Sequence, residues 1–181
     1  MDEQNLKSDA DRLLYEFGLL ERLNEIGRAH IIGSYRMDMM AWRDLDIDIE
    51  NETMSQEKLY ELTGFILKTF RPTWYEAKQV IDDRGKRVWF HGFETLCCGE
   101  LWNVDLWFFD KETCEGAAAF CDAISARADE EMRKCIGDIK RALIESGEYC
   151  FEKFTSMDVY SAVLDHGVTD IEGFFKLHNK A

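Results

Sequence analysis

The sequence lacks any long hydrophobic run, and no apolar stretch approaches the roughly 18 residues that a membrane-spanning helix needs. Its first residues, 1–5, are polar and acidic, which is unlike a secretory signal peptide. We therefore expect a cytoplasmic protein with no membrane partner. Hydrophobic residues still make up 46% of the 181 residues and aromatic residues 13%, so the chain can bury a core.

The motifs of several enzyme classes are also missing. The four histidines show no HxxxH or HExxH spacing, which argues against a zinc hydrolase. There is no GxxxxGK[ST] phosphate loop and no GxSxG turn, so a P-loop kinase and a covalent hydrolase lack support. The six cysteines contain no CxxC pair, and we expect buried free thiols, with Cys114 and Cys121 on one face of a helix.

Basic residues are few, with 22 Lys and Arg against 36 Asp and Glu, and the net charge is −14. Binding to a phosphate backbone depends on clustered Lys and Arg, so this balance argues against a nucleic-acid partner. It suits a cationic partner through long-range attraction. The alternative is that the acidity serves solubility alone.

Hydrophobic periodicity divides the chain into an α/β half, residues 1–110, and a helical half, residues 111–181. Helices are predicted at 9–27 and 55–70, and strands at 29–32, 44–50, 73–82, 87–95 and 100–109. The last two strands are predicted to form a hairpin across residues 97–99. A long helical stretch, 114–147, and two short helices, 156–165 and 169–178, complete the prediction.

The strongest feature is an acidic strand in which Asp44, Asp46 and Asp48 alternate with aliphatic residues. Side chains two residues apart project from the same face of a strand, so like charges are held side by side. Clustered carboxylates suit Mg²⁺, which takes one or two carboxylates together with substrate phosphates. The alternative is an edge strand whose acids only face solvent.

Two further features favour a site. Gly33-Ser34 ends a buried strand and offers backbone N–H groups and a hydroxyl to phosphate oxygens. Asp105 lies inside an otherwise apolar strand, where an unpaired carboxylate is costly and needs a partner such as a metal or an active-site cleft. The aromatic residues that flank Asp105 are expected in the core, although one of them could stack on a base.

These residues together resemble the nucleotidyltransferase superfamily that includes DNA polymerase beta and the small antibiotic and lincosamide nucleotidyltransferases. The shared pattern is Gly33-Ser34, then Asp44-Leu45-Asp46 ten to twelve residues later, then Asp105 on a following strand. The resemblance covers roughly residues 28–109. It implies an α+β fold with a mixed β-sheet flanked by helices, followed by the C-terminal helical region.

The resemblance also implies an enzyme that moves a nucleoside monophosphate from a nucleoside triphosphate to a small acceptor, possibly a cation of the aminoglycoside or lincosamide kind. Gly33 and Ser34 would hold phosphates, and Asp44 and Asp46 would hold the Mg²⁺ that accompanies the nucleotide. Asp105 would complete a second Mg²⁺ site and act as the base.

The roles of two arginines, and one departure from the family's sequence pattern, leave alternatives open. Arg36 and Arg43 either neutralise phosphate charge or form salt bridges with acids, and Asp48 supports the site. Many small members have a glycine four residues after the serine, where this chain has Asp38. A catalytically inactive relative, such as a toxin–antitoxin component, is therefore the alternative function. The acceptor, the base and the oligomeric state stay open.

Overall fold

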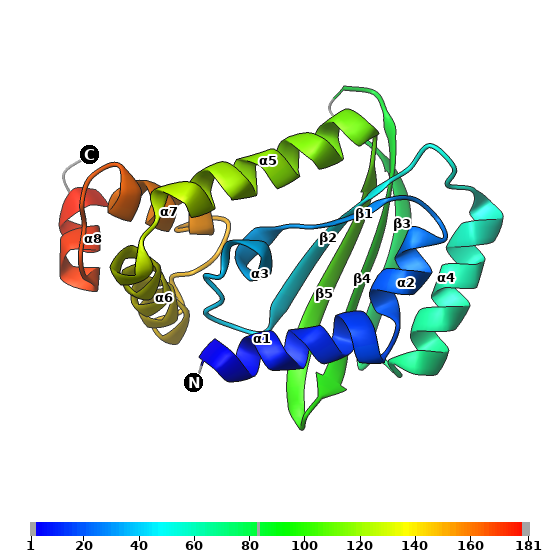
Figure 1. Cartoon of the computed structure of the whole chain (residues 1–181), viewed down its shortest axis with the longest axis horizontal. Helices are drawn as coiled ribbons and strands as arrows, with labels where there is room; N and C mark the ends of the chain where they lie inside the picture. The colour runs from blue at the N-terminus through cyan, green and yellow to red at the C-terminus, as the bar shows by residue number, and fades with distance from the viewer. Residues whose placement is uncertain (1–2, 83, 179–181) are drawn as a thin grey trace.

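The computed structural model describes residues 3–82 and 84–178, and Figure 1 shows a twisted sheet with helices against it and a helical group beyond its end. The elements in chain order are α1 (Glu3–Asp11), the π-helical η1 (Arg12–Glu16), α2 (Leu19–Asn24), β1 (Ala29–Ile31), α3 (Gly33–Met37), β2 (Asp44–Glu50), α4 (Gln56–Thr69), β3 (Trp74–Ile81), β4 (Arg87–Cys97), β5 (Glu100–Phe109), α5 (Lys111–Arg127), α6 (Glu130–Glu145), α7 (Ser156–Leu164) and α8 (Ile171–His178).

The sheet has five strands in the order β1-β2-β5-β4-β3. Strands β2 and β5 are parallel, and the other neighbouring pairs are antiparallel, so the sheet is mixed as predicted. The aliphatic residues of β2, namely Leu45, Ile47 and Ile49, are each 0% exposed. Because alternate side chains point to opposite faces, the acids between them all project from the other face.

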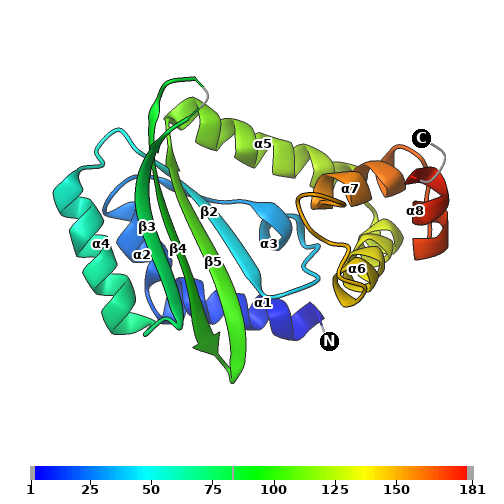
Figure 2. The same cartoon turned by 180° about the vertical axis from the view of Figure 1, so that it is seen from behind.

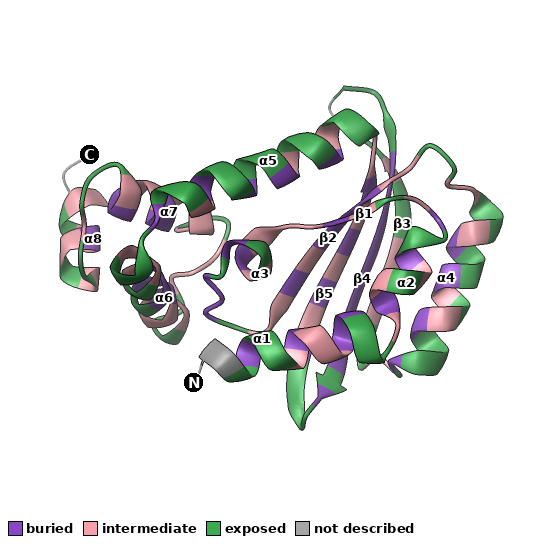
Figure 3. Cartoon of the chain, in the orientation of Figure 1, coloured by how far each residue is buried: buried purple, intermediate pink, exposed green. Residues whose placement is uncertain are grey.

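Helices α1, α2 and α4 cover the aliphatic face of the sheet, where purple buried stripes follow the strands in Figure 3. Helix α4 presents Leu59, Leu62 and Ile66 to this core at helical spacing. Its first turn is capped by Ser55, whose hydroxyl accepts a hydrogen bond from the backbone N–H of Lys58 at 3.3 Å. The acids of β2 lie on the opposite face of the sheet, away from this layer.

The predicted helix at 9–27 is not continuous. Gly18 adopts a φ of 74°, in the left-handed region, and separates η1 from α2. The hydrophobic spacing persists across the break, with Leu13, Leu14 and Leu23 all buried, which is why periodicity alone predicted one helix.

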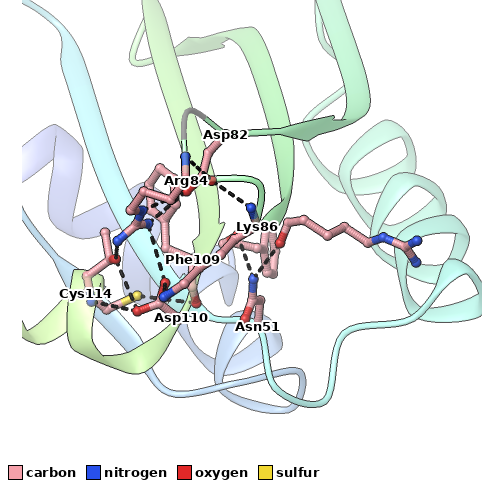
Figure 4. Close-up of polar contacts among 10 residues, drawn as sticks. Asn51, Asp82, Arg84, Lys86, Phe109, Asp110 and Cys114 are labelled. Carbon is pink, nitrogen blue, oxygen red and sulfur yellow. Dashed lines mark hydrogen bonds and ion pairs between the residues drawn. The ribbon is translucent and has the colours of Figure 1, made fainter.

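Helix α5 is anchored at the end of β5 by a cluster of polar contacts with the β3–β4 hairpin (Figure 4). Asp110 caps the helix by accepting a hydrogen bond from the backbone N–H of Thr113 at 3.1 Å. Lys86 lies 3.0 Å from the same carboxylate, and this contact, before the others, lowers the pKa of Asp110 to about 2. Arg84 also reaches Asp110, at 3.4 Å. The segment between β3 and β4 therefore holds the start of α5 at the end of β5.

The C-terminal helices have a second hydrophobic core, which includes Ile136, Leu143 and Phe174 as well as residues of α5 and the α3 region. The predicted stretch 114–147 divides at Asp129, which caps α6 through the backbone N–H of Met132 at 2.8 Å. Cys114 and Cys121 are buried as predicted, whereas Cys98 is exposed; all six cysteines are free. Among the described residues, no helix is both long and apolar enough to cross a membrane.

Candidate functional site

The pairing of β2 with β5 brings the predicted carboxylates together. Asp46 is the Cα partner of Asp105, and Asp44 is the partner of Asn103. Neighbouring strands lie about 4.8 Å apart, so the three acids sit within one small area. Asn103 donates a hydrogen bond to Asp44 at 2.8 Å. The alternative in which the acids are unrelated surface charges requires Asp105 to lie far from Asp46, and the register does not fit it.

Gly33 lies directly against the acid pair. Strand β1 ends one residue before Ile32, and α3 begins at Gly33 with a φ of 65°. A Cβ at this position would lie 2.4 Å from Oδ2 of Asp46, so the missing side chain allows the backbone to approach the carboxylate. Ser34, 7% exposed, follows it in the same turn.

Gly33→Ala is therefore expected to disturb the site through a contact as well as through backbone strain. The left-handed φ costs an alanine about 1 kcal/mol or more, and the clash with Asp46 adds to it. We expect a lower melting temperature and weaker divalent-cation binding, measured by thermal denaturation and calorimetry. Gly18→Ala is the matched control, since Gly18 has a φ of 74° and open space around its missing Cβ. Equal effects of both substitutions would contradict the proposed contact.

The acids share a surplus of negative charge. Burial raises the pKa of Asp46 to about 8, with further contributions from the charges of Asp44, Asp105 and Asp48. Burial also raises the pKa of Asp44 and that of Asp105 above their usual range. Asp48 is 3% exposed, and burial raises its pKa to about 7. A cation bound between the carboxylates would relieve this repulsion.

Lys140 on α6 is a functional candidate that the sequence did not indicate. Its side chain is buried, at 1% exposure, and its Nζ lies 3.3 Å from the hydroxyl of Tyr160. Burial lowers the pKa of Lys140 to about 8, while the charges of Asp44 and Asp46 oppose this shift. The sequence feature that could have pointed to Lys140 is its place in the apolar stripe of α6, between Ile139 and Leu143.

A cavity of about 380 Å³ connects these groups. One part of its wall is formed by α3, its flanking residues and the acid pair of β2, and the other part by α5, α6, α7 and the loop at Tyr149. Its lining residues are Ile32, Gly33, Ser34, Met37, Trp42, Asp44, Asp46, Ala117, Phe120, Cys121, Lys140, Tyr149, Ser156, Met157 and Tyr160. The cavity thus combines carboxylates, a buried ammonium and aromatic rings, which is a combination suited to a nucleotide.

The structure does not bring the two predicted arginines into this cavity. Arg36 pairs with Asp122, with N–O distances of 2.8 and 2.9 Å. Arg43 pairs with Glu100 at 3.4 Å. Both side chains therefore form salt bridges, the alternative left open by the sequence, though with acids outside the predicted site. Their role in nucleotide binding stays a prediction.

Asp38, at the glycine position of the resembled pattern, adopts the left-handed conformation with a φ of 58°. This is the conformation that glycine takes most easily, and aspartate is among the few residues that tolerate it. Lys7 contacts its carboxylate at 2.8 Å. The departure from the pattern therefore leaves the turn after α3 intact.

Mg²⁺ fits the donor set at Asp44 and Asp46. Within residues 3–82 and 84–178, no group of three His, Cys, Asp or Glu side chains is placed to hold a metal by itself. Mg²⁺ in nucleotide enzymes needs fewer protein ligands, because phosphate oxygens and water supply the rest. Burial, and then the charges of Asp44, Asp105 and Asp48, raise the pKa of Asp46, and a bound cation would favour its ionised form.

The fold is similar to that of several solved transferase and polymerase structures. A cytoplasmic RNA terminal U-transferase matches with a TM-score of 0.57 and 13% identity, over 88% of this chain and 47% of the other. The Cid1 poly(U) polymerase with Mg and 3′-dATP bound matches with a TM-score of 0.61 and 12% identity, over 91% and 50%. The polymerase core of TRAMP, an RNA surveillance complex, matches with a TM-score of 0.50 and 14% identity, over 89% of this chain and 46% of the other.

The chain has the same fold as these transferase and polymerase structures, and the predicted mixed sheet flanked by helices is confirmed. The similar structures are named as transferases and polymerases. The chain spans about half the length of these structures. No protein-family model and no curated protein sequence matches it.

The prediction that argued against a nucleic-acid partner is wrong, because the similar structures are named as RNA enzymes or as part of an RNA surveillance complex. It rested on the net charge of −14. Net charge sums the whole surface, whereas recognition of a strand depends on local charges and on rings that stack against bases. The acidity of the chain therefore does not exclude RNA.

Proposed function

We propose that this chain is a Mg²⁺-dependent nucleotidyltransferase that moves a nucleoside monophosphate from a nucleoside triphosphate to an acceptor hydroxyl in the cytoplasm. The observation that carries the proposal is the shared cavity of Gly33, Ser34, Asp44, Asp46 and Lys140, with Asp105 beside Asp46. A similar structure that holds Mg and 3′-dATP supports both the metal and the nucleotide. Residues 1–110 would form the catalytic domain, and residues 111–181 would close the nucleotide site.

The residues have distinct roles in the proposed reaction. Asp44 and Asp46 would hold the ion that accompanies the nucleotide, and Asp105 would complete a second site. Bound Mg²⁺ supplies charge stabilisation for the attacking and leaving oxygens. Ser34 and the backbone N–H groups of the turn bind phosphate oxygens, and the Lys140 ammonium offsets their charge.

The acceptor oxygen attacks the α-phosphorus, pyrophosphate leaves, and the proton of the acceptor hydroxyl passes to the carboxylate of Asp105. Two acceptor classes have support. An RNA 3′-hydroxyl is supported by the printed names of the similar structures. A small hydroxyl-bearing cation is supported by the net charge of −14.

The test combines binding and turnover. Mg²⁺ with ATP or UTP should raise the melting temperature of the wild-type chain, and Asp44→Asn should abolish the increase, because the pair of carboxylates is then incomplete. Pyrophosphate release is next measured with a single-stranded RNA and with an aminoglycoside as acceptors. A melting curve that neither nucleotide nor metal changes contradicts the proposal. Nucleotide binding without pyrophosphate release from any acceptor favours the inactive relative.

A further inference from the structure

One face of strands β3, β4 and β5 has no described helix over it, and Figure 2 shows these strands in front. Alternate residues of the strands share this face. On β5 they include Asp105, Trp107 and Phe109, which are all partly exposed. On β3, Trp74 is 43% exposed. The open face therefore carries aromatic rings close to the third predicted carboxylate.

The rings of Trp74, Phe90, Trp107 and Phe109 form what we call the aromatic row. The Phe90 and Trp107 centroids lie 4.5 Å apart, and Trp107 stacks on Phe109 at 5.5 Å with an interplanar angle of 9°. Phe90 is itself buried, at 6% exposure, and is the Cα partner of Trp107 on the neighbouring strand. A surface of ordered, partly exposed rings is suited to a flat ligand.

Gly92 places one end of the row beside Asp105. It is the Cα partner of Asp105 on the neighbouring strand. A Cβ at Gly92 would lie 2.5 Å from Cζ of Phe90 and 2.9 Å from Cη2 of Trp74, so both rings lie over this glycine. The Trp74 ring is therefore adjacent to the strand position from which Asp105 projects.

Asp105 also separates the row from the nucleotide cavity. Among the described residues, the cavity wall includes Asp44 and Asp46 but not Asp105. Across the sheet, Asp105 on β5 lies between Asp46 of the cavity wall on β2 and Gly92 on β4. In a transfer reaction the acceptor hydroxyl must approach the nucleotide from the side of the general base. In the proposed function this general base is Asp105.

We propose that the aromatic row stacks against the terminal bases of a single-stranded RNA acceptor and directs its 3′-hydroxyl to Asp105. This inference rests on the proposed function and names its acceptor. Stacking on aromatic rings is tolerant of sequence, because every base has a π-face. The row lies beside the carboxylate of Asp105, which receives the proton. The 3′-terminal nucleotide of the RNA can therefore stack on the row while its hydroxyl reacts.

The charges on this face indicate how the strand would bind. Glu76 and Glu94 share the face with Lys78, which contacts Glu76 at 3.1 Å and lies 5.1 Å above the Phe90 ring. Few cations are thus available to phosphates, and binding through stacking releases few counterions. We expect the affinity for RNA to fall with salt much less steeply than it does for a protein that tracks the phosphate backbone.

The experiment measures binding of a short, 5′-labelled single-stranded RNA by fluorescence anisotropy at several salt concentrations, in the presence of Mg²⁺. Trp74→Leu should weaken binding about tenfold, because it removes the ring from an exposed position. Trp74→Phe, which keeps an aromatic face, should restore most of the affinity. Tyr60→Leu is the matched control, because Tyr60 is 66% exposed on α4, away from the row.

Nucleotide binding separates this inference from the proposed function. Trp74→Leu should keep the increase in melting temperature caused by Mg²⁺ and nucleotide. Unchanged RNA affinity in Trp74→Leu, or an equal loss in Tyr60→Leu, overturns the inference and leaves the proposed function standing. Binding of an aminoglycoside in place of RNA, with the same dependence on Trp74, also overturns it. Loss of the nucleotide effect in the wild-type chain contradicts the proposed function itself.

Discussion

Asp46→Asn is expected to reduce nucleotidyl transfer on the order of a thousandfold and to remove the effect of Mg²⁺ on nucleotide binding. Asp46 lies at the centre of the acid group, with Asp44 on its own strand and Asp105 opposite. The asparagine keeps the shape of the side chain but loses the charge that binds the cation. Pyrophosphate release and calorimetric titration with Mg²⁺ measure the two effects.

The same substitution has a pH dependence of known sign. The pKa of Asp46 is raised from 3.8 to about 8. The folded protein therefore holds a proton that the unfolded chain releases, so this group makes the free energy of unfolding fall as pH rises from 3.8 to 8. In EDTA, Asp46→Asn should be more stable than wild type by on the order of 1 kcal/mol at pH 8, and by less at pH 5.

Protons and Mg²⁺ compete for the same oxygens, so the wild-type affinity for Mg²⁺ should rise between pH 6 and about pH 8. Glu52→Gln serves as the control, since Glu52 is an exposed acid in the loop after β2. It should change neither turnover nor the pH dependence of stability. If Asp46→Asn retains Mg²⁺-dependent transfer, the assignment of Asp46 as a metal ligand is wrong.

Lys140→Met is expected to weaken nucleoside triphosphate binding about tenfold to hundredfold while the protein stays folded. Among the described residues that line the cavity, Lys140 is the one Lys or Arg, and its ammonium is buried near Asp44 and Asp46. A charge-assisted contact with phosphate contributes roughly 1.5–3 kcal/mol, and the substitution removes it. Methionine fills a similar volume without the cost of burying a charge.

Lys134→Met is the matched control on the same helix, because the Lys134 side chain is 74% exposed and contacts Asp138 at 2.7 Å. It should leave nucleotide affinity unchanged. Calorimetric titration with Mg²⁺-ATP and Mg²⁺-UTP gives the affinities, and thermal denaturation checks the fold. Equal affinities of Lys140→Met and wild type would show that the buried ammonium serves the fold and not the nucleotide.

Some features of the candidate site were predicted from sequence patterns, and others were not. The alternation around Asp44 and Asp46 predicted a strand with an acidic face, and β2 has it. The hairpin before β5 is confirmed, with left-handed φ values of 56° and 83° at Cys98 and Gly99. Lys140 was missed because a lysine in a helical stripe has no local signal of what it will face.

Two expectations failed for the same reason. The continuous helix at 9–27 was predicted from periodicity, which a left-handed Gly18 does not interrupt. The argument against RNA was drawn from net charge, which takes no notice of where the charges lie. Periodicity describes a whole segment and net charge describes the whole chain, whereas the backbone break and the recognition surface are local.

By itself, the sequence determined the acidic strand, the Gly33-Ser34 turn and the resemblance to nucleotidyltransferases, because these depend on spacing along a single strand or turn. Only the tertiary structure decided that Asp105 is the strand partner of Asp46, that Lys140 lies near the acids, and that aromatic rings lie beside Asp105. These positions depend on which strands become neighbours and which helix covers them. Contacts between residues far apart in the chain determine which strands are neighbours and which helix covers them. A local sequence pattern does not contain these contacts.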